Sequence, residues 1–85
     1  MRRSETAMAR RVDDDLVILD IPSGQYFELN DVGALLWERL DGTNSVEDLI
    51  DVVLAEYDID RQTASTDVED LLGEMIRAGL VVKDA

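Results

Sequence analysis

The chain has 85 residues, with 8 Lys and Arg against 20 Asp and Glu, a net charge of −12, and neither Cys nor His. This length gives one domain that buries about 60% of its unfolded surface. Without Cys or His the chain lacks disulfides, thiolate metal ligands and the commonest catalytic base and nucleophile. We therefore expect a domain that is not an enzyme and has no cofactor or metal.

Half of the basic residues lie near the start of the chain: Arg2, Arg3, Arg10 and Arg11. The remainder is strongly anionic, which repels nucleic acid and anionic membranes and attracts a basic or neutral partner. Residues 1–9 show no hydrophobic periodicity, so we expect a flexible tail there and one ordered domain over residues 10–85. Neither a signal peptide nor a membrane span is recognisable, so we expect a cytoplasmic protein.

Strand signals come first along the chain. Apolar, β-favouring runs at residues 16–20 and 25–29 flank a Pro-Ser-Gly turn, which predicts a hairpin. A short strand at residues 11–13 would precede it and complete a three-stranded sheet. In the last strand Phe27 and Leu29 share one face, which joins the core, and Tyr26 and Glu28 share the other, which faces water or a ligand.

Two helix starts follow directly. Asn30 is a good N-cap for a helix from residue 31 to about residue 40, where Gly42 would end it. Ser45 and Asp48 form a capping-box pattern at the start of a second amphipathic helix, which runs to Tyr57.

A third helix is predicted to begin between Gln62 and Thr66 and to run to Ala78, with Gly79 as the residue that ends it. Residues 80–82 then return as a short extended segment. The predicted fold is therefore α+β, with a three-stranded antiparallel sheet followed by three helices in a winged helix-turn-helix-like arrangement.

The third helix argues against DNA binding. A helix that enters a DNA groove needs positive charge, but this one carries Asp67, Glu69, Asp70 and Glu74 against Arg77 alone. Nucleic acid is therefore not an expected partner.

A calcium site is suggested by the acidic residues at the two ends of segment 58–69, whose spacing resembles an EF-hand loop. Thr63 stands where that loop needs Gly, and Gln62 replaces a carboxylate. We therefore expect a connecting loop that caps the third helix.

A carrier protein is the alternative function. Asn44-Ser45-Val46 at the start of a helix resembles the second helix of acyl or peptidyl carrier proteins, in which Ser45 would be the phosphopantetheine attachment site. Carriers normally have Asp before that Ser, and their four helices leave no place for strands. Ser45 as a plain N-cap is the preferred interpretation.

Taken together, the pattern from Val17 to Val82 resembles the PqqD-like family, the precursor-recognition domains of ribosomal peptide pathways. It is most similar to the stand-alone form found with lasso-peptide gene sets. The matching segments are residues 16–20, 23–30, 34–37, 41–42 and 78–81.

The resemblance implies an adaptor that binds a precursor's leader peptide by β-strand addition. It would present the leader to a separate leader protease and a cyclase. The exposed strand edge also allows strand exchange or dimerisation of an otherwise monomeric protein.

The implied site lies between the third strand and the third helix. The backbones of Gln25, Tyr26, Phe27 and Glu28 would pair with the leader, Leu71 and Met75 would line an apolar pocket or belong to the ordinary core, and Asp67, Asp70 and Glu74 would receive a basic leader residue. The complete set of expected peptide-binding residues is Gly24, Gln25, Tyr26, Phe27, Glu28, Leu29, Asp67, Asp70, Leu71, Glu74 and Met75.

Overall fold

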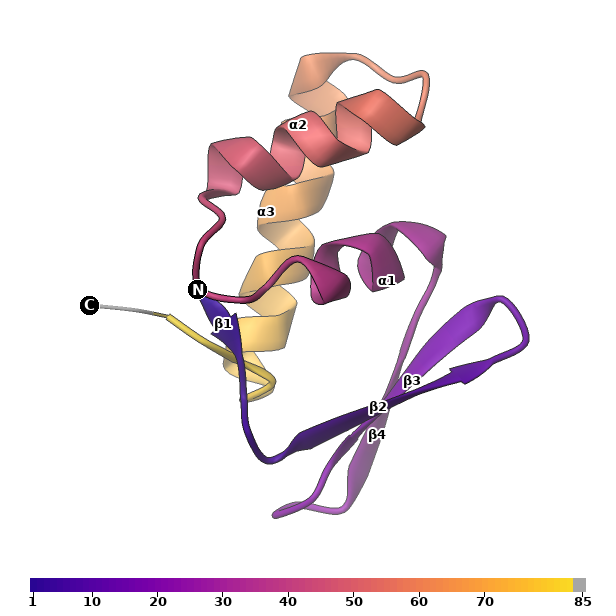
Figure 1. The fold of residues 1–85 in the computed structure, drawn as a ribbon, viewed down its shortest axis with the longest axis vertical. Coiled ribbons are helices and arrows are strands. Elements are labelled where there is room, and N and C mark those ends of the chain that lie inside the picture. The colour runs from indigo at the N-terminus through magenta and orange to yellow at the C-terminus, as the bar shows by residue number, and fades with distance from the viewer. Residues whose placement is uncertain (84–85) are drawn as a thin grey trace.

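The computed structural model describes residues 1–83 and has two small sheets and three helices (Figure 1). In chain order the elements are β1 (Arg2–Arg3), β2 (Ala7–Val12), β3 (Asp15–Asp20), β4 (Gln25–Leu29), α1 (Asp31–Glu38), α2 (Val46–Glu56), α3 (Arg61–Arg77) and β5 (Val81–Val82). The larger sheet is antiparallel with the order β2-β3-β4, and β1 pairs with β5. The predicted winged helix-turn-helix-like α+β fold is confirmed.

Strand register explains which face of the larger sheet is buried. Ile18 lies between Ala9 and Phe27 on the inner face, against α1, whereas Leu19 lies between Met8 and Tyr26 on the outer face. Ile18 has no exposed surface, while Tyr26 is 70% exposed. The predicted assignment of the two faces of β4 is therefore confirmed.

The core lies between this inner face and the helices. Its buried residues are Leu16, Ile18, Leu29, Ala34, Leu36, Trp37, Leu40, Leu49, Ile50, Val53, Ala64, Val68, Leu72, Met75, Leu80 and Val81. Phe27, predicted to be core, is only partly buried and packs against this cluster. No polar or charged residue is buried within residues 1–83.

Side-chain caps fix the helix starts. The Asn30 side chain accepts from the Gly33 N–H at 3.1 Å, and Ser45 and Asp48 form the predicted reciprocal capping box. The Asp60 carboxylate accepts from the Thr63 N–H at 2.7 Å, so α3 begins at Arg61, just before the predicted range.

Helix ends are less well predicted. α1 ends at Glu38 rather than near residue 40, because Leu40 turns into the core and its carbonyl accepts from the Arg3 N–H. At the end of α3, Leu80 N–H donates to Met75 and Gly79 N–H donates to Ile76, with Gly79 at φ +78°. This is a Schellman motif, and it confirms the predicted stop at Gly79.

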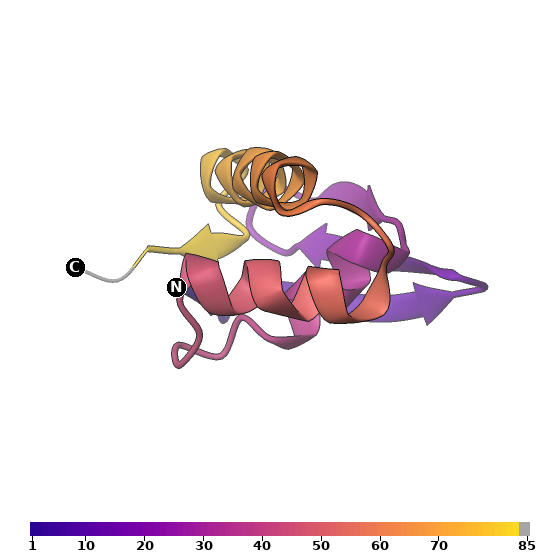
Figure 2. The ribbon, with the colours of Figure 1, turned by 90° about the horizontal axis from the view of Figure 1, so that it is seen from above.

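Residues 1–9 differ from the predicted flexible tail. Arg2 and Arg3 form β1, and the segment from Ala7 belongs to β2. Figure 2 shows the N-terminus close to β5, with which β1 pairs. The partner of β1 is distant in sequence, so local periodicity gave no sign of this strand. None of the described helices is long and apolar enough to cross a membrane.

Candidate peptide-binding groove

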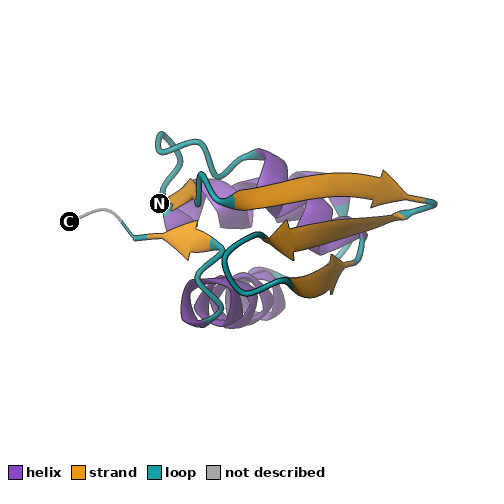
Figure 3. Ribbon diagram, turned by 90° about the horizontal axis from the view of Figure 1, so that it is seen from below, coloured by secondary structure: helices purple, strands orange, loops and turns teal. Residues whose placement is uncertain are grey.

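The edge of β4 is the central feature of the site. β4 pairs with β3 on one side only, and α3 runs beside its other side (Figure 3). A cavity of about 190 Å³ lies between them. It is lined by Phe27, Glu28, Leu29, Leu71, Glu74, Met75, Ala78 and Leu80.

This end of the groove is apolar. Leu29, Met75 and Leu80 are buried and form its floor, and Leu71 is partly buried at its side. Leu71 and Met75 both line this cavity, and Met75, only 2% exposed, is also a core residue. An apolar side chain is the natural occupant of such a floor.

Towards the start of α1 the groove becomes acidic. A second hollow is lined by Asp15, Glu28, Leu29, Asn30, Leu71 and Glu74. A third is lined by Asn30, Val32, Asp67, Asp70, Leu71 and Glu74. The shared Leu71 and Glu74 make the hollows continuous with the apolar end, and no Lys or Arg lines them.

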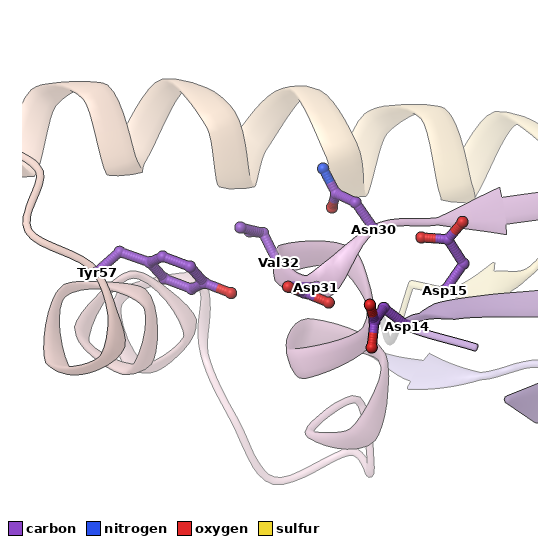
Figure 4. Close-up of a pocket in the computed structure, with 6 residues that line it drawn as sticks. All are labelled: Asp14, Asp15, Asn30, Asp31, Val32 and Tyr57. Atoms are coloured by element: carbon purple, nitrogen blue, oxygen red, sulfur yellow. The ribbon is translucent and has the colours of Figure 1, made fainter. Parts of the chain in front are cut away.

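A fourth hollow continues this acidic end (Figure 4). Here the Tyr57 ring, at the end of α2, points toward Val32 and Asp31. Asp14, in the β2–β3 turn, and Asp15, the first residue of β3, lie across from them with Asn30. The acidic end therefore reaches from α3 to that turn.

The structure brings most of the predicted residues together. Those from β4 that line the cavity are Phe27, Glu28 and Leu29, whereas Gly24, Gln25 and Tyr26 line none of these hollows. The lining residues that sequence reasoning missed are Asp14, Asp15, Asn30, Asp31, Val32, Tyr57, Ala78 and Leu80. Asn30 was recognised only as a cap, and the position of Leu80 depends on the Schellman turn.

The other candidate chemistry has a structural explanation. Ser45 caps α2, in a fold that is not the four-helix carrier fold. Gln62, Thr63 and Glu69 lie within α3, so no calcium-binding loop spans them. Within residues 1–83 no cluster of metal-ligand side chains occurs.

Three ionisable groups with a shifted pKa lie at exposed positions outside the groove: Asp41, Asp60 and Arg61. Hydrogen bonds from the hydroxyl and backbone N–H of Thr43 lower the pKa of Asp41, and those from Thr63 lower the pKa of Asp60. Glu47 and Asp51 raise the pKa of Arg61, which donates to both at 2.7 and 3.0 Å. These three groups serve a turn, a helix cap and the α2–α3 connection.

An unpaired strand edge that faces a helix across an apolar groove is the arrangement of a domain that binds extended peptides. The chain belongs to the PqqD family: the family model described as coenzyme PQQ synthesis protein D matches residues 15–81.

Two solved structures are similar over nearly the whole chain. One, "TbiB1 in Complex with the TbiA(beta) Leader Peptide", is 32% identical with a TM-score of 0.88, covering 100% of this chain and 99% of the other. The second, "Lasso peptide synthetase B1 complexed with the leader peptide", is 29% identical with a TM-score of 0.85, covering 96% of each chain. No curated protein matches the sequence.

Proposed function

We propose that this protein is a non-catalytic adaptor in lasso peptide biosynthesis that binds the leader of a precursor peptide in the cytoplasm. It delivers the bound leader to a separate protease and cyclase. The observation that carries the proposal is the unpaired β4 edge beside the α3 groove, in a chain similar along its length to two leader-bound proteins.

In this proposal the leader adds a strand to β4. Backbone groups of Gln25 to Glu28 supply the hydrogen bonds, which are independent of leader sequence. Leader side chains alternate between the two faces of the extended sheet, so every second one points to the groove. An apolar residue fills the pocket at Leu71 and Met75, and a basic residue contacts Asp67, Asp70 or Glu74 at the acidic end.

The first test is a titration of the isotopically labelled protein with synthetic leader peptides, including the TbiA(beta) leader and those encoded beside this gene. We expect saturable NMR shifts at Gln25 to Leu29 and at Asp67 to Met75. If no peptide binds, or if the shifts fall elsewhere, the proposal is wrong.

Strand addition makes a sharper demand on the peptide. N-methylation removes one backbone donor, so methylating successive residues of a bound leader should weaken binding at alternate positions only. An equal loss at every position would instead indicate binding through side chains.

The groove is tested with two matched leucines. Leu71 and Leu54 are both partly buried on helix surfaces, but only Leu71 lines the groove. We expect Leu71→Ser to weaken leader binding by about tenfold, the loss of roughly 1.4 kcal/mol of apolar contact. Leu54→Ser should bind the leader as the parent does.

A further inference from the structure

The N-terminal segment, residues 1–12, connects the two walls of the groove, which are the sheet that contains β4 and the helix α3. Residues 7–12 form β2, which belongs to the sheet that carries β4, while Arg2 and Arg3 pair with Val82 and Val81 in β5, directly after α3. None of residues 1–12 lines the groove. One continuous segment therefore connects the sheet wall and the helix wall without lining the groove itself.

One of its hydrogen bonds reaches Leu80, a residue of the groove floor. The Ser4 N–H donates to the Leu80 carbonyl at 2.8 Å, and the Leu80 N–H donates to the Met75 carbonyl at 2.9 Å. Both backbone groups of Leu80 are thus fixed, one by the Schellman turn and one by the N-terminal segment. Leu80 is 1% exposed and lines the apolar cavity together with Met75.

Arg3 anchors the same segment to α1. Its N–H donates to the Leu40 carbonyl at 2.9 Å, and its guanidinium donates to the Trp37 carbonyl at 3.3 Å and reaches the Glu38 carbonyl at 3.5 Å. These carbonyls end α1, where a cation is favourable. The segment therefore joins the end of α1 to the end of α3.

We propose that residues 2–4 act as a clasp that positions Leu80 and the C-terminal end of α3, and so keeps the apolar end of the groove ready to bind an extended peptide. This inference rests on the proposed function. The clasp residues are positioning residues: when they are released, the end of α3 moves more freely relative to β4. Binding must then order that wall, and the apparent affinity falls with the fraction of molecules in which it is in place.

Two substitutions of one residue separate the clasp bond from the side chain. Ser4→Pro removes the N–H that donates to Leu80, and its ring suits a position preceded by the strand residue Arg3. Ser4→Ala keeps that N–H and removes only the hydroxyl, which contacts Thr6. The probe is the leader peptide from the panel above that binds the parent protein most tightly.

We expect Ser4→Pro to raise the Kd for the leader about tenfold, which corresponds to a tenfold smaller fraction of molecules with the end of α3 in place. The Kd of Ser4→Ala should stay within about twofold of the parent value. A Kd for Ser4→Pro within about twofold of the parent value would overturn the proposal. If Ser4→Pro does not fold, Arg3→Gln replaces it under the same criteria, because it removes only the guanidinium contacts with α1.

A measurement without peptide separates this inference from the proposed function. Hydrogen exchange of the Leu80 amide and methyl relaxation of Leu71, Met75 and Leu80 report on the wall itself. We expect both to show faster opening in Ser4→Pro than in Ser4→Ala. If no panel peptide binds the parent protein, the proposed function is wrong. Equal rates of opening at Leu80 in the two variants would reject the clasp, whatever the peptide titrations show.

Discussion

Gly33, in the first turn of α1, lies directly against Leu29, the last residue of β4: a Cβ on Gly33 would come within 2.8 Å of the Leu29 Cβ. Real Cβ atoms do not approach so closely, and Leu29 is held in the core. The absence of a side chain at Gly33 therefore allows β4 to turn into α1 beside the groove.

Alanine substitutions at two helix glycines should have opposite effects. Gly33→Ala forces Leu29 or the start of α1 to move, and we expect it to lower the free energy of unfolding by about 1–3 kcal/mol. At Gly73, in α3, the nearest atom to an added Cβ is the movable end of Arg77, 3.4 Å away. Gly73→Ala should therefore stabilise the protein by about 0.5–1 kcal/mol through helix propensity. Urea unfolding of both variants checks this, and effects of the same sign would contradict it.

Charge reversal at the acidic end should weaken capture of a basic leader. Glu74 lines three of the hollows, whereas Glu56, also exposed and at the end of α2, lines none of them. We expect Glu74→Lys to reduce affinity for a leader that contains Lys or Arg and to flatten its salt dependence. Glu56→Lys changes the net charge identically and should have a much smaller effect. Calorimetric titrations at two salt concentrations distinguish contact at the groove from a general charge effect.

Acid should remove part of the stability that the α3 cap supplies. Hydrogen bonds from Thr63 and Gln62 lower the pKa of Asp60 from 3.8 in the folded state. A carboxyl with a depressed folded pKa stabilises the fold above the unfolded pKa, and this contribution is lost as pH falls through the folded pKa. Asn also caps helices but does not titrate. The urea midpoint should therefore decrease less between pH 7 and pH 3 in Asp60→Asn than in the parent protein. An identical decrease in the two proteins would refute this.

Ser45 should prove structural. Its hydroxyl accepts from the Asp48 N–H at 3.1 Å and the Asp48 carboxylate accepts from the Ser45 N–H at 3.0 Å. We expect Ser45→Ala to lower stability by about 1 kcal/mol, the usual contribution of an N-cap, without changing leader affinity. A phosphopantetheinyl transferase should add no mass to the parent protein. Attachment of the prosthetic arm to Ser45 would restore the carrier interpretation.

Local features of the fold could be predicted from the sequence, and distant contacts could not. The β3–β4 hairpin, the faces of β4 and the Ser45 capping box depend on neighbouring residues, so period and cap chemistry revealed them. β1 depends on β5 at the other end of the chain, and its two Arg residues carry no strand pattern.

The candidate site divides in the same way. Phe27, Leu29, Leu71 and Glu74 were expected to lie in the groove because the family resemblance paired that strand with that helix, and all four line the cavity. Leu80 and Asn30 were not expected in the groove, since Leu80 is brought to it by the turn after α3 and Asn30 by its role as the cap of α1. The sequence also did not show how far the acidic end extends, because Asp15 reaches it only through the register of β3 and β4.

The pairing of Arg2 with Val82 has a consequence for the order of folding. The two hairpins of the larger sheet close over short turns and need only the first part of the chain, whereas the β1–β5 pair closes a loop of nearly the whole sequence. During synthesis β1 has no strand to pair with until Val81 and Val82 leave the ribosome. The apolar end of the groove, whose floor includes Leu80, is therefore expected to form later than the larger sheet.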